Sequence, residues 1–365
     1  MTMPEATAAQ KIDIIPLKQL HYAQARPSLR ATLKQEITDF CVDENLGFAF
    51  TGAGEHLCMR LKKTNLSTLA VAERIATLTG ASMADIGYAG IKDRRAECTQ
   101  WFSLPLAELA EGRIGAIEDE QLTILETQRN GRKIRIGSHR GNRFRIRLRH
   151  CVGAQSEFDR ALAAIKEIGV PNYFGAQRFG RQMTNITQLL ELIAAAGAQT
   201  RPKGQRYTRG MLYSAGRAYL FNQLLSARLC SGNWNQYVAG DVLNLGGTGR
   251  YFLLKGDEDW DQTLQRRLDS FDIHISGPLA GITAPKDKYV SSGEAADIED
   301  AVLKQFPTLV NGLCHFGLRA GRRALRFLPG ELEWCWLETG ELELRFSLGR
   351  GCYATSLLRE LCDTD

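Results

Sequence analysis

Apolar and polar residues alternate with a period of two in several segments of the chain. Two segments show this clearly, with apolar faces formed by Leu57, Met59 and Leu61 in 55–61 and by Phe144, Ile146 and Leu148 in 143–149. Such alternation predicts strands with one buried face. Near the C-terminus, 334–337 and 342–346 alternate on either side of a Glu-Thr-Gly-Glu turn, which predicts a β-hairpin. We therefore expect antiparallel pairing in both the first and the last part of the chain.

Other segments have the spacing of amphipathic helices. Ser67 and Thr68 precede apolar residues at 69, 72, 75 and 76, which predicts a capped helix that ends at Gly80. A second helix is predicted around Phe158, with apolar residues at 162 and 165 and a stop at Gly169.

The pattern changes in the middle of the chain. From about 171 to 315 it favours longer helical stretches, 184–196 and 211–230, and the alternation typical of strands resumes only after about 320. The two flanking parts resemble each other more than either resembles the middle. This order predicts an α+β protein in which a middle domain interrupts a discontinuous, strand-rich domain.

Length and composition agree with a folded protein of two domains. The chain has 365 residues, 44% of them hydrophobic and 24% charged, which excludes a disulfide-stapled miniature and argues against disorder. No run of about 18 apolar residues occurs, and the N-terminus lacks the pattern of a signal peptide. We therefore expect a cytoplasmic protein that does not cross a membrane.

Arginine is the most informative part of the composition. The net charge is only +5, but 33 of the 46 basic residues are Arg. The run from Arg129 to Arg149 contains eight Arg and Lys133 and no acidic residue. Four of these arginines, at 143, 145, 147 and 149, share one face of a predicted strand, where like charges lie about 7 Å apart. Two interpretations are open: the strand binds the backbone of a nucleic acid, or it pairs with acidic neighbours.

Cysteine and histidine give no sign of a metal site. The nine cysteines are widely spaced and never form a Cys-x-x-Cys pair, and the six histidines show no ligand spacing. Gly246-Gly-Thr-Gly249 fits neither nucleotide-binding glycine motif, so ATP or NAD use is not indicated. No Gly-x-Ser-x-Gly elbow of a hydrolase occurs.

Two short polar segments are candidates for chemistry. In Gly87–Ala96, Asp93 stands between Lys92 and Arg94 just after a glycine-flanked turn, and it is either a nucleophile or base, or part of a solvated turn. In Asn172–Gly180, three aromatic residues and an Arg follow a helix stop, a composition that suits base stacking or the core of a domain joint.

Several ordered motifs carry a resemblance to one family. The chain resembles the TruD family of tRNA pseudouridine synthases over nearly its whole length, in the following segments: Leu33-Lys34 with Asp39–Glu44, Gly54–His56, Gly87–Arg94 with Gln100–Phe102, Gly141–Phe144, Asn172–Gly180, and Ala354–Ser356 with Arg359-Glu360. Six matches in the family's order make a chance resemblance very improbable.

The resemblance implies a fold and an activity. The fold is an α+β pseudouridine synthase core with a mixed or antiparallel sheet, built from 1–167 and 317–365, and an inserted α/β TRUD domain at 168–316. The activity is the isomerisation of uridine to pseudouridine at position 13 of tRNA, in the D-arm. It implies tRNA as the partner, with no cofactor, no metal and no obligatory protein partner.

The resemblance also implies site residues. Asp93 matches the catalytic aspartate, a nucleophile that attacks the flipped uridine at C1′ or at C6. The other matched positions line the substrate pocket or lie close to it: Asn142, Phe144, Phe40, Tyr353 and Lys34. At the position of Tyr353 the family most often has Phe. We also expect four arginines to contact the RNA, Arg143, Arg145, Arg147 and Arg178. The alternative is a non-catalytic RNA-binding protein in which Asp93 is a turn residue.

Overall fold

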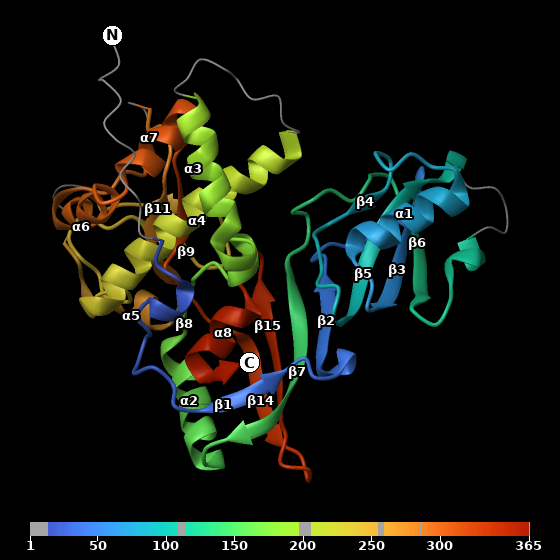
Figure 1. Ribbon diagram of the computed structural model, residues 1–365, viewed down its shortest axis with the longest axis horizontal. Coiled ribbons are helices and arrows are strands. Elements are labelled where there is room, and N and C mark those ends of the chain that lie inside the picture. The colour runs from blue at the N-terminus through green and yellow to red at the C-terminus, as the bar shows by residue number, and fades with distance from the viewer. Residues whose placement is uncertain (1–13, 109–113, 197–205, 255–258, 285–286, 365) are drawn as a thin grey trace. The chain divides into compact units, whose positions relative to one another are not determined.

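The computed structural model describes residues 14–108, 114–196, 206–254, 259–284 and 287–364 (Figure 1). Contacts divide the chain into two compact units. The sheet unit comprises 27–168, 328–354 and 361–365, and the helical unit comprises the residues up to Arg26, 169–327 and 355–360. Among the described residues, no helix is long and apolar enough to cross a membrane.

A mixed ten-stranded sheet forms the centre of the sheet unit. Its main path runs through β14 (Gly330–Trp336), β15 (Leu342–Gly349), β7 (Gly141–Val152), β2 (Phe40–Asn45), β5 (Glu97–Pro105), β3 (His56–Thr64) and β6 (Leu122–Asn130). Off this path, β1 (Arg30–Leu33) pairs with β7 and β16 (Asp363–Thr364), and β4 (Gly87–Tyr88) pairs with β5. Neighbours along the path are antiparallel except β2 and β5, which are parallel.

The predicted strands and helices of this unit are confirmed. Helix α1 (Thr68–Thr79) begins after Ser67, whose hydroxyl accepts a hydrogen bond from the N–H of Ala70, and ends at Gly80 with a left-handed φ of 82°. Its apolar face packs on β3 and β5, where Met59 and Leu61 are buried. Helix α2 (Gln155–Ile168) ends before Gly169, as predicted.

The helical unit is built around one long helix, α4 (Arg206–Cys230), which packs against several other elements (Figure 1). The other helices are α3 (Thr184–Ala196), α5 (Gln262–Asp269), α6 (Gly293–Leu303), α7 (Pro307–His315) and α8 (Ala354–Leu361). A four-stranded sheet has the order β10 (Tyr251–Phe252), β9 (Leu243–Leu245), β11 (Ile273–Leu279) and β12 (Gly321–Ala324), and β13 (Arg326–Phe327) pairs with β8 (Val170–Pro171).

One expectation about this region needs correction. The prediction that strands resume only after about 320 was wrong, because β9 and β11 lie within the middle segment. Five consecutive residues of β11, from Ile273 to Gly277, are buried, including the polar His274 and Ser276, so both faces of this strand are covered by the unit.

The boundaries of the two units also differ from those expected. Residues 14–26, 317–327 and 355–360 belong with the helical unit. The N–H of Ile15 donates to the hydroxyl of Tyr219 at 3.1 Å, and Ser356 donates to the carbonyl of Tyr173 at 2.8 Å. Such contacts join segments that are remote in the sequence, and local patterns do not reveal them.

Candidate active site

Asp93 lies on the loop between β4 and β5, within the sheet unit. Its side chain is 49% exposed, and one carboxylate oxygen is 2.6 Å from Nζ of Lys34. Lys34 directly follows β1 and has a left-handed φ of 57°, a conformation that non-glycine residues rarely adopt. The backbone therefore turns sharply at the residue that brings an ammonium group to this carboxylate.

Aromatic rings from three adjacent strands lie next to this ion pair. Nζ of Lys34 is 4.0 Å from the ring centre of Phe40 on β2. Phe40 contacts Phe144 on β7 edge-on, with 6.0 Å between the ring centres, and Phe144 stacks on Phe346 of β15 at 5.3 Å. The site thus joins a paired carboxylate to a row of aromatic rings, an arrangement that suits binding of a planar base.

A buried hydrogen-bond network holds the loop before Asp93. The N–H of Lys92 donates to the hydroxyl of Thr68 at 2.9 Å, and this hydroxyl donates to the amide oxygen of Gln100 at 2.9 Å. The amide nitrogen of Gln100 donates to the carbonyl of Gly90 at 2.5 Å. The first turn of α1 and strand β5 therefore fix both ends of the segment 90–92.

A fully buried lysine holds the backbone of Asp93 itself. Nζ of Lys63, on β3, donates to the carbonyl of Asp93 at 2.8 Å and to the carbonyl of Leu66 at 2.6 Å. Burial lowers the pKa of Lys63, but an amine retains two N–H groups for these two carbonyls in either protonation state. The carbonyl of Asp93 also accepts a weak bond from the thiol of Cys98, with 3.7 Å between sulfur and oxygen.

A second buried cation lies beside the aspartate in the sequence. Nζ of Lys92 is 2.6 Å from a carboxylate oxygen of Glu44, and both side chains are almost entirely buried. The other oxygen of Glu44 accepts the N–H of Trp101 at 3.1 Å. Glu44 on β2 lies opposite Asn142 on β7. The side-chain oxygen of Asn142 is buried and has no hydrogen-bond partner among the described residues.

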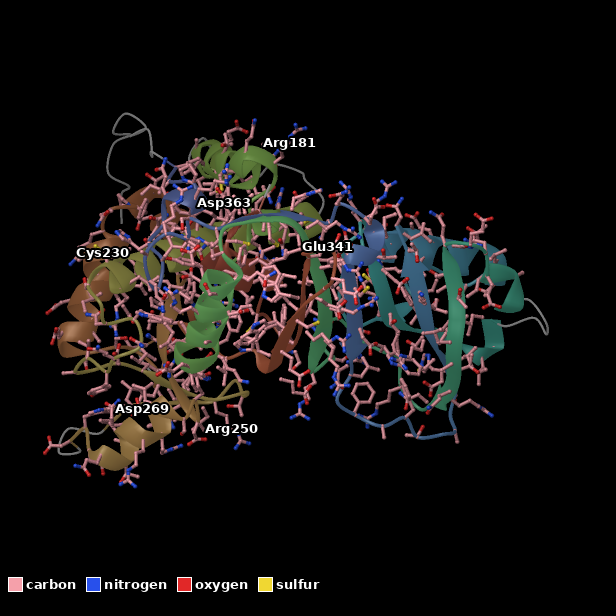
Figure 2. All side chains as sticks on the ribbon, turned by 90° about the horizontal axis from the view of Figure 1, so that it is seen from below. Arg181, Cys230, Arg250, Asp269, Glu341 and Asp363 are labelled. Carbon is pink, nitrogen blue, oxygen red and sulfur yellow. The ribbon has the colours of Figure 1, made fainter. Side chains whose placement is uncertain are left out.

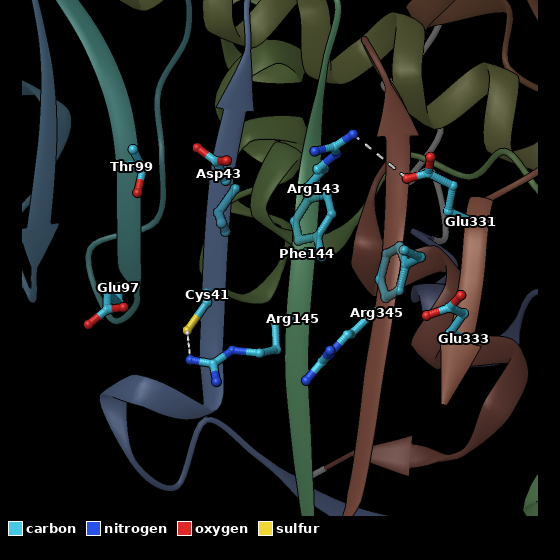
Figure 3. A pocket seen from close by; sticks show the side chains of 12 residues that line it. Cys41, Asp43, Glu97, Thr99, Arg143, Phe144, Arg145, Glu331, Glu333 and Arg345 are labelled. Carbon is cyan, nitrogen blue, oxygen red and sulfur yellow. Dashed lines mark hydrogen bonds and ion pairs between the residues drawn. The ribbon is translucent and has the colours of Figure 1, made fainter. Parts of the chain in front are cut away.

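The strand arginines point away from this site. Side chains alternate across β7, so Arg143, Arg145 and Arg147 lie on the opposite face of the sheet from Asn142 and Phe144. Figure 3 shows Arg143 and Arg145 in a cavity of about 520 Å³ on that face, together with several acidic side chains.

Acidic side chains on or directly before the neighbouring strands neutralise part of this row. Arg149 forms a bidentate pair with the buried Asp39 and a further bond at 2.5 Å to Glu341. Figure 2 labels Glu341 among the side chains. Arg147 lies 3.6 Å from Glu341 and 3.8 Å from Glu343. The observations favour pairing with acidic neighbours over phosphate binding for this half of the arginine run.

The remaining candidates are less closely tied to Asp93. Tyr353 is half-buried and lies between β15 and α8. Arg178 belongs to the helical unit, where it donates to the hydroxyl of Ser214 at 3.2 Å. Two of the three aromatic residues near Arg178, Tyr173 and Phe179, are buried in that unit, which favours the core interpretation of 172–180.

A comparison with known families agrees with this geometry. The family model of tRNA pseudouridine synthase D (TruD) matches residues 17–195 and 204–361. The chain belongs to the TruD family. A relative from Methylococcus capsulatus, tRNA pseudouridine synthase D, is 42% identical over 94% of both chains. A protein of the same name from Hydrogenovibrio crunogenus is 37% identical over 95% of this chain and 97% of its own.

The fold also agrees with a solved structure. A crystal structure from Methanosarcina mazei that carries the TruD name matches with a TM-score of 0.70 and 22% identity, covering 93% of this chain and 95% of that one. At this identity the likeness concerns the fold. The two structures share a mixed α/β architecture.

The TruD motifs predicted residues that line the candidate site, but not the buried residues that hold its loop. Lys34, Phe40, Phe144 and Asp93 form a continuous set of contacts. The sequence analysis assigned no role in the site to Phe346, Lys63, Glu44, Thr68 and Gln100, although Glu44 and Gln100 lie within matched segments. Phe346 follows Leu342 and Leu344 on one face of its strand, so its position beside Phe144 could be found from strand alternation and the register. The buried polar residues carry no comparable local signal. Among the described residues, no group of three potential metal ligands occurs.

Proposed function

We propose that this protein isomerises uridine to pseudouridine at position 13, in the D-arm, of tRNA, with Asp93 as the nucleophile and without a cofactor. The contact between Lys34 and Asp93 beside the Phe40–Phe144–Phe346 row carries the proposal, because it joins a held carboxylate to a surface for a planar base. The names of the relatives support tRNA as the substrate class.

The reaction balances without a redox partner. The carboxylate of Asp93 attacks the extruded nucleotide at C1′ of the ribose or at C6 of the base, and the bond between C1′ and N1 breaks. The uracil turns, C5 bonds to C1′, and the bond between Asp93 and the nucleotide breaks, which returns the free carboxylate. The proton on C5 leaves to solvent and N1 gains a proton. Product and substrate therefore contain the same atoms, so no oxidant, reductant or group donor is needed.

The site supplies two things that this chemistry requires. Extrusion of a stacked base costs a few kcal/mol, and stacking on Phe144 and contact with the edge of Phe40 offset part of this cost. The carboxylate must also be aimed at the nucleotide, and Lys34 and Lys63 hold its side chain and its backbone respectively. Asn142 and Tyr353 are the further pocket residues of the proposal.

Mapping of pseudouridine in tRNA after incubation with wild-type and Asp93→Ala protein tests this proposal. Pseudouridine has the mass of uridine, so the tRNA is first derivatised with a reagent specific for pseudouridine. We expect modification at position 13 by the wild type, none by Asp93→Ala, and binding of tRNA by both.

A matched control is available on the opposite face of the sheet. Asp43 is also half-exposed and is paired with Arg60 at 2.9 Å, and Asp43→Ala is expected to retain modification. Modification by Asp93→Ala at the wild-type rate would overturn the role of the aspartate. Binding of tRNA by the wild type without any modification would identify a non-catalytic RNA-binding protein.

A further inference from the structure

The acid-free arginine run is divided into two parts by the structure. Its second part lies on β7, where acidic neighbours surround it. Its first part includes the loop 131–140 between β6 and β7, called here the basic loop. Arg132, Arg135 and Arg140 on this loop are exposed, and none forms an ion pair with an acidic residue in the described ranges. The loop therefore carries three exposed arginines without an ion pair, whereas on β7 only Arg145 lacks one among the described residues, and it contacts the thiol of Cys41.

The basic loop is firmly attached to the sheet. Ile134, in its middle, is buried, and its N–H donates to the hydroxyl of Ser103 on β5 at 2.9 Å. A Cβ on Gly87 would lie 2.3 Å from the carbonyl of Ile134, so glycine is required for this close approach. At the start of the loop, the side chain of Asn130 donates to the carbonyl of Arg132 at 2.7 Å. The arginines are thus carried by a fixed backbone.

The basic loop is also joined to the loop that bears Asp93. The N–H of Gly137 donates to the carbonyl of Ala89 at 2.7 Å, and Nδ1 of His139 lies 3.3 Å from the same oxygen. Arg350, at the end of β15, donates to the carbonyl of Gly137 at 2.6 Å. The attachment point is four residues before Asp93 in the sequence, so the basic loop is bonded to the same loop that carries the candidate nucleophile.

Each of the two joined loops exposes a large apolar side chain. Ile136 is 74% exposed and Ile91 is 61% exposed. Exposed apolar side chains beside cations are typical of surfaces that contact nucleic acids, where arginines bind phosphates and the apolar group packs against an unstacked base.

We propose that the basic loop, with Arg350, is the surface that docks the backbone of the substrate RNA next to the extruded nucleotide. Arg132, Arg135 and Arg140 contact phosphates, and Ile136 packs against a base exposed by the extrusion. The inference rests on the proposed function, because it names the part of the protein that binds the same substrate. It assigns RNA contact to the basic loop instead of the arginine face of β7.

Binding of tRNA at several salt concentrations tests this assignment. The first variant combines Arg132→Ser, Arg135→Ser and Arg140→Ser, and the matched control combines Arg143→Ser and Arg145→Ser on the exposed face of β7. Each phosphate contact contributes about one unit to the slope of log affinity against log salt. The loop variant should lose about three units of slope and bind about 100-fold more weakly at 0.1 M salt. The control should change the affinity less than about threefold.

The outcomes separate this inference from the proposed function. A loop variant with the affinity and salt slope of the wild type would overturn the inference, as would a loss of slope confined to the β7 control. Neither result touches the role of Asp93, which pseudouridine mapping tests separately. A third variant, Ile136→Ser, should bind tRNA nearly as the wild type does but form pseudouridine at least about tenfold more slowly. An unchanged rate would overturn the packing role of Ile136. All variants change exposed side chains, so a melting temperature near that of the wild type serves as the folding control.

Discussion

At the residue scale, Lys63 is the least expected part of the site, because it acts on the backbone of Asp93 and not on its carboxylate. A buried lysine is costly, and here two carbonyls satisfy it at 2.8 and 2.6 Å. One of these carbonyls belongs to Asp93 and the other precedes α1. We interpret Lys63 as a positioning residue that ties the loop of Asp93 to the start of this helix.

The substitution Lys63→Met keeps the length of the side chain and removes both donors. It should lower the free energy of unfolding by about 1–3 kcal/mol, because buried carbonyls lose their partners. Misplacement of Asp93 should lower kcat about 10- to 100-fold, with the affinity for tRNA changed less than twofold.

Steady-state kinetics, tRNA binding and thermal unfolding give the three readouts. Lys62 on the same strand is 42% exposed and pairs with Glu97, so Lys62→Met is the matched control and should leave kcat unchanged. A Lys63→Met protein that is less stable but turns over normally would show that Lys63 is merely structural.

Residues of the site differ in how far the sequence could predict them. Asp93, Lys34 and Phe40 were predicted from family motifs, and the structure places them in contact. The roles of Lys63 and Glu44 could not be predicted, because the function of a buried polar residue on a strand is recognised only from its partners. Those partners lie on other elements: the loop after β4 carries Asp93 and Lys92.

At the scale of elements, strand β7 separates two kinds of residue by its alternation. One face carries Asn142 and Phe144 toward the candidate site, and the other carries the arginines. The sequence predicted this strand and its two faces correctly, since alternation is a local property. It could not predict which acidic residues would lie beside the arginines, because strand order depends on contacts between distant segments.

The pairing of Arg149 predicts a large effect on stability. Asp39 is 1% exposed; burial raises its pKa, but the bonds from Arg149 and the N–H of Glu36 outweigh this and lower it overall. Arg149→Met would leave Asp39 buried without its main cation and should lower the free energy of unfolding well beyond the change at an exposed arginine.

Denaturant unfolding measures this difference. Arg143 is 65% exposed and lies 3.9 Å from Glu331, so Arg143→Met should change the stability by less than about 0.5 kcal/mol. Equal effects of the two substitutions would contradict the structural role of Arg149.

At the scale of the whole molecule, acid is predicted to destabilise the helical unit through one buried histidine. Burial, followed by the nearby charge of Arg326, lowers the pKa of His274 in the helical unit to about 4. Between pH 6.5 and 4 the unfolded chain binds a proton at this imidazole that the folded unit does not bind. As the pH is lowered from 6.5 to 4, the free energy of unfolding of the helical unit should therefore decrease, by up to about 3 kcal/mol.

Hydrogen exchange of β11 and β9 at pH 7 and at pH 4.5 reports this loss locally. His274→Phe removes the titrating group, so the variant should lose less protection on acidification than the wild type does. An equal loss in both proteins would show that another group governs the acid response.

The central claim for the molecule is that Asp93 forms pseudouridine in tRNA. The most direct measurement is release of tritium from tRNA labelled at C5 of uridine. C5 loses its hydrogen to solvent when it forms the bond to C1′. The wild type should release one tritium for each uridine converted, and Asp93→Asn, which keeps the size of the side chain and removes its charge, should release none above background while still binding tRNA. Release by Asp93→Asn at the wild-type rate would contradict the account.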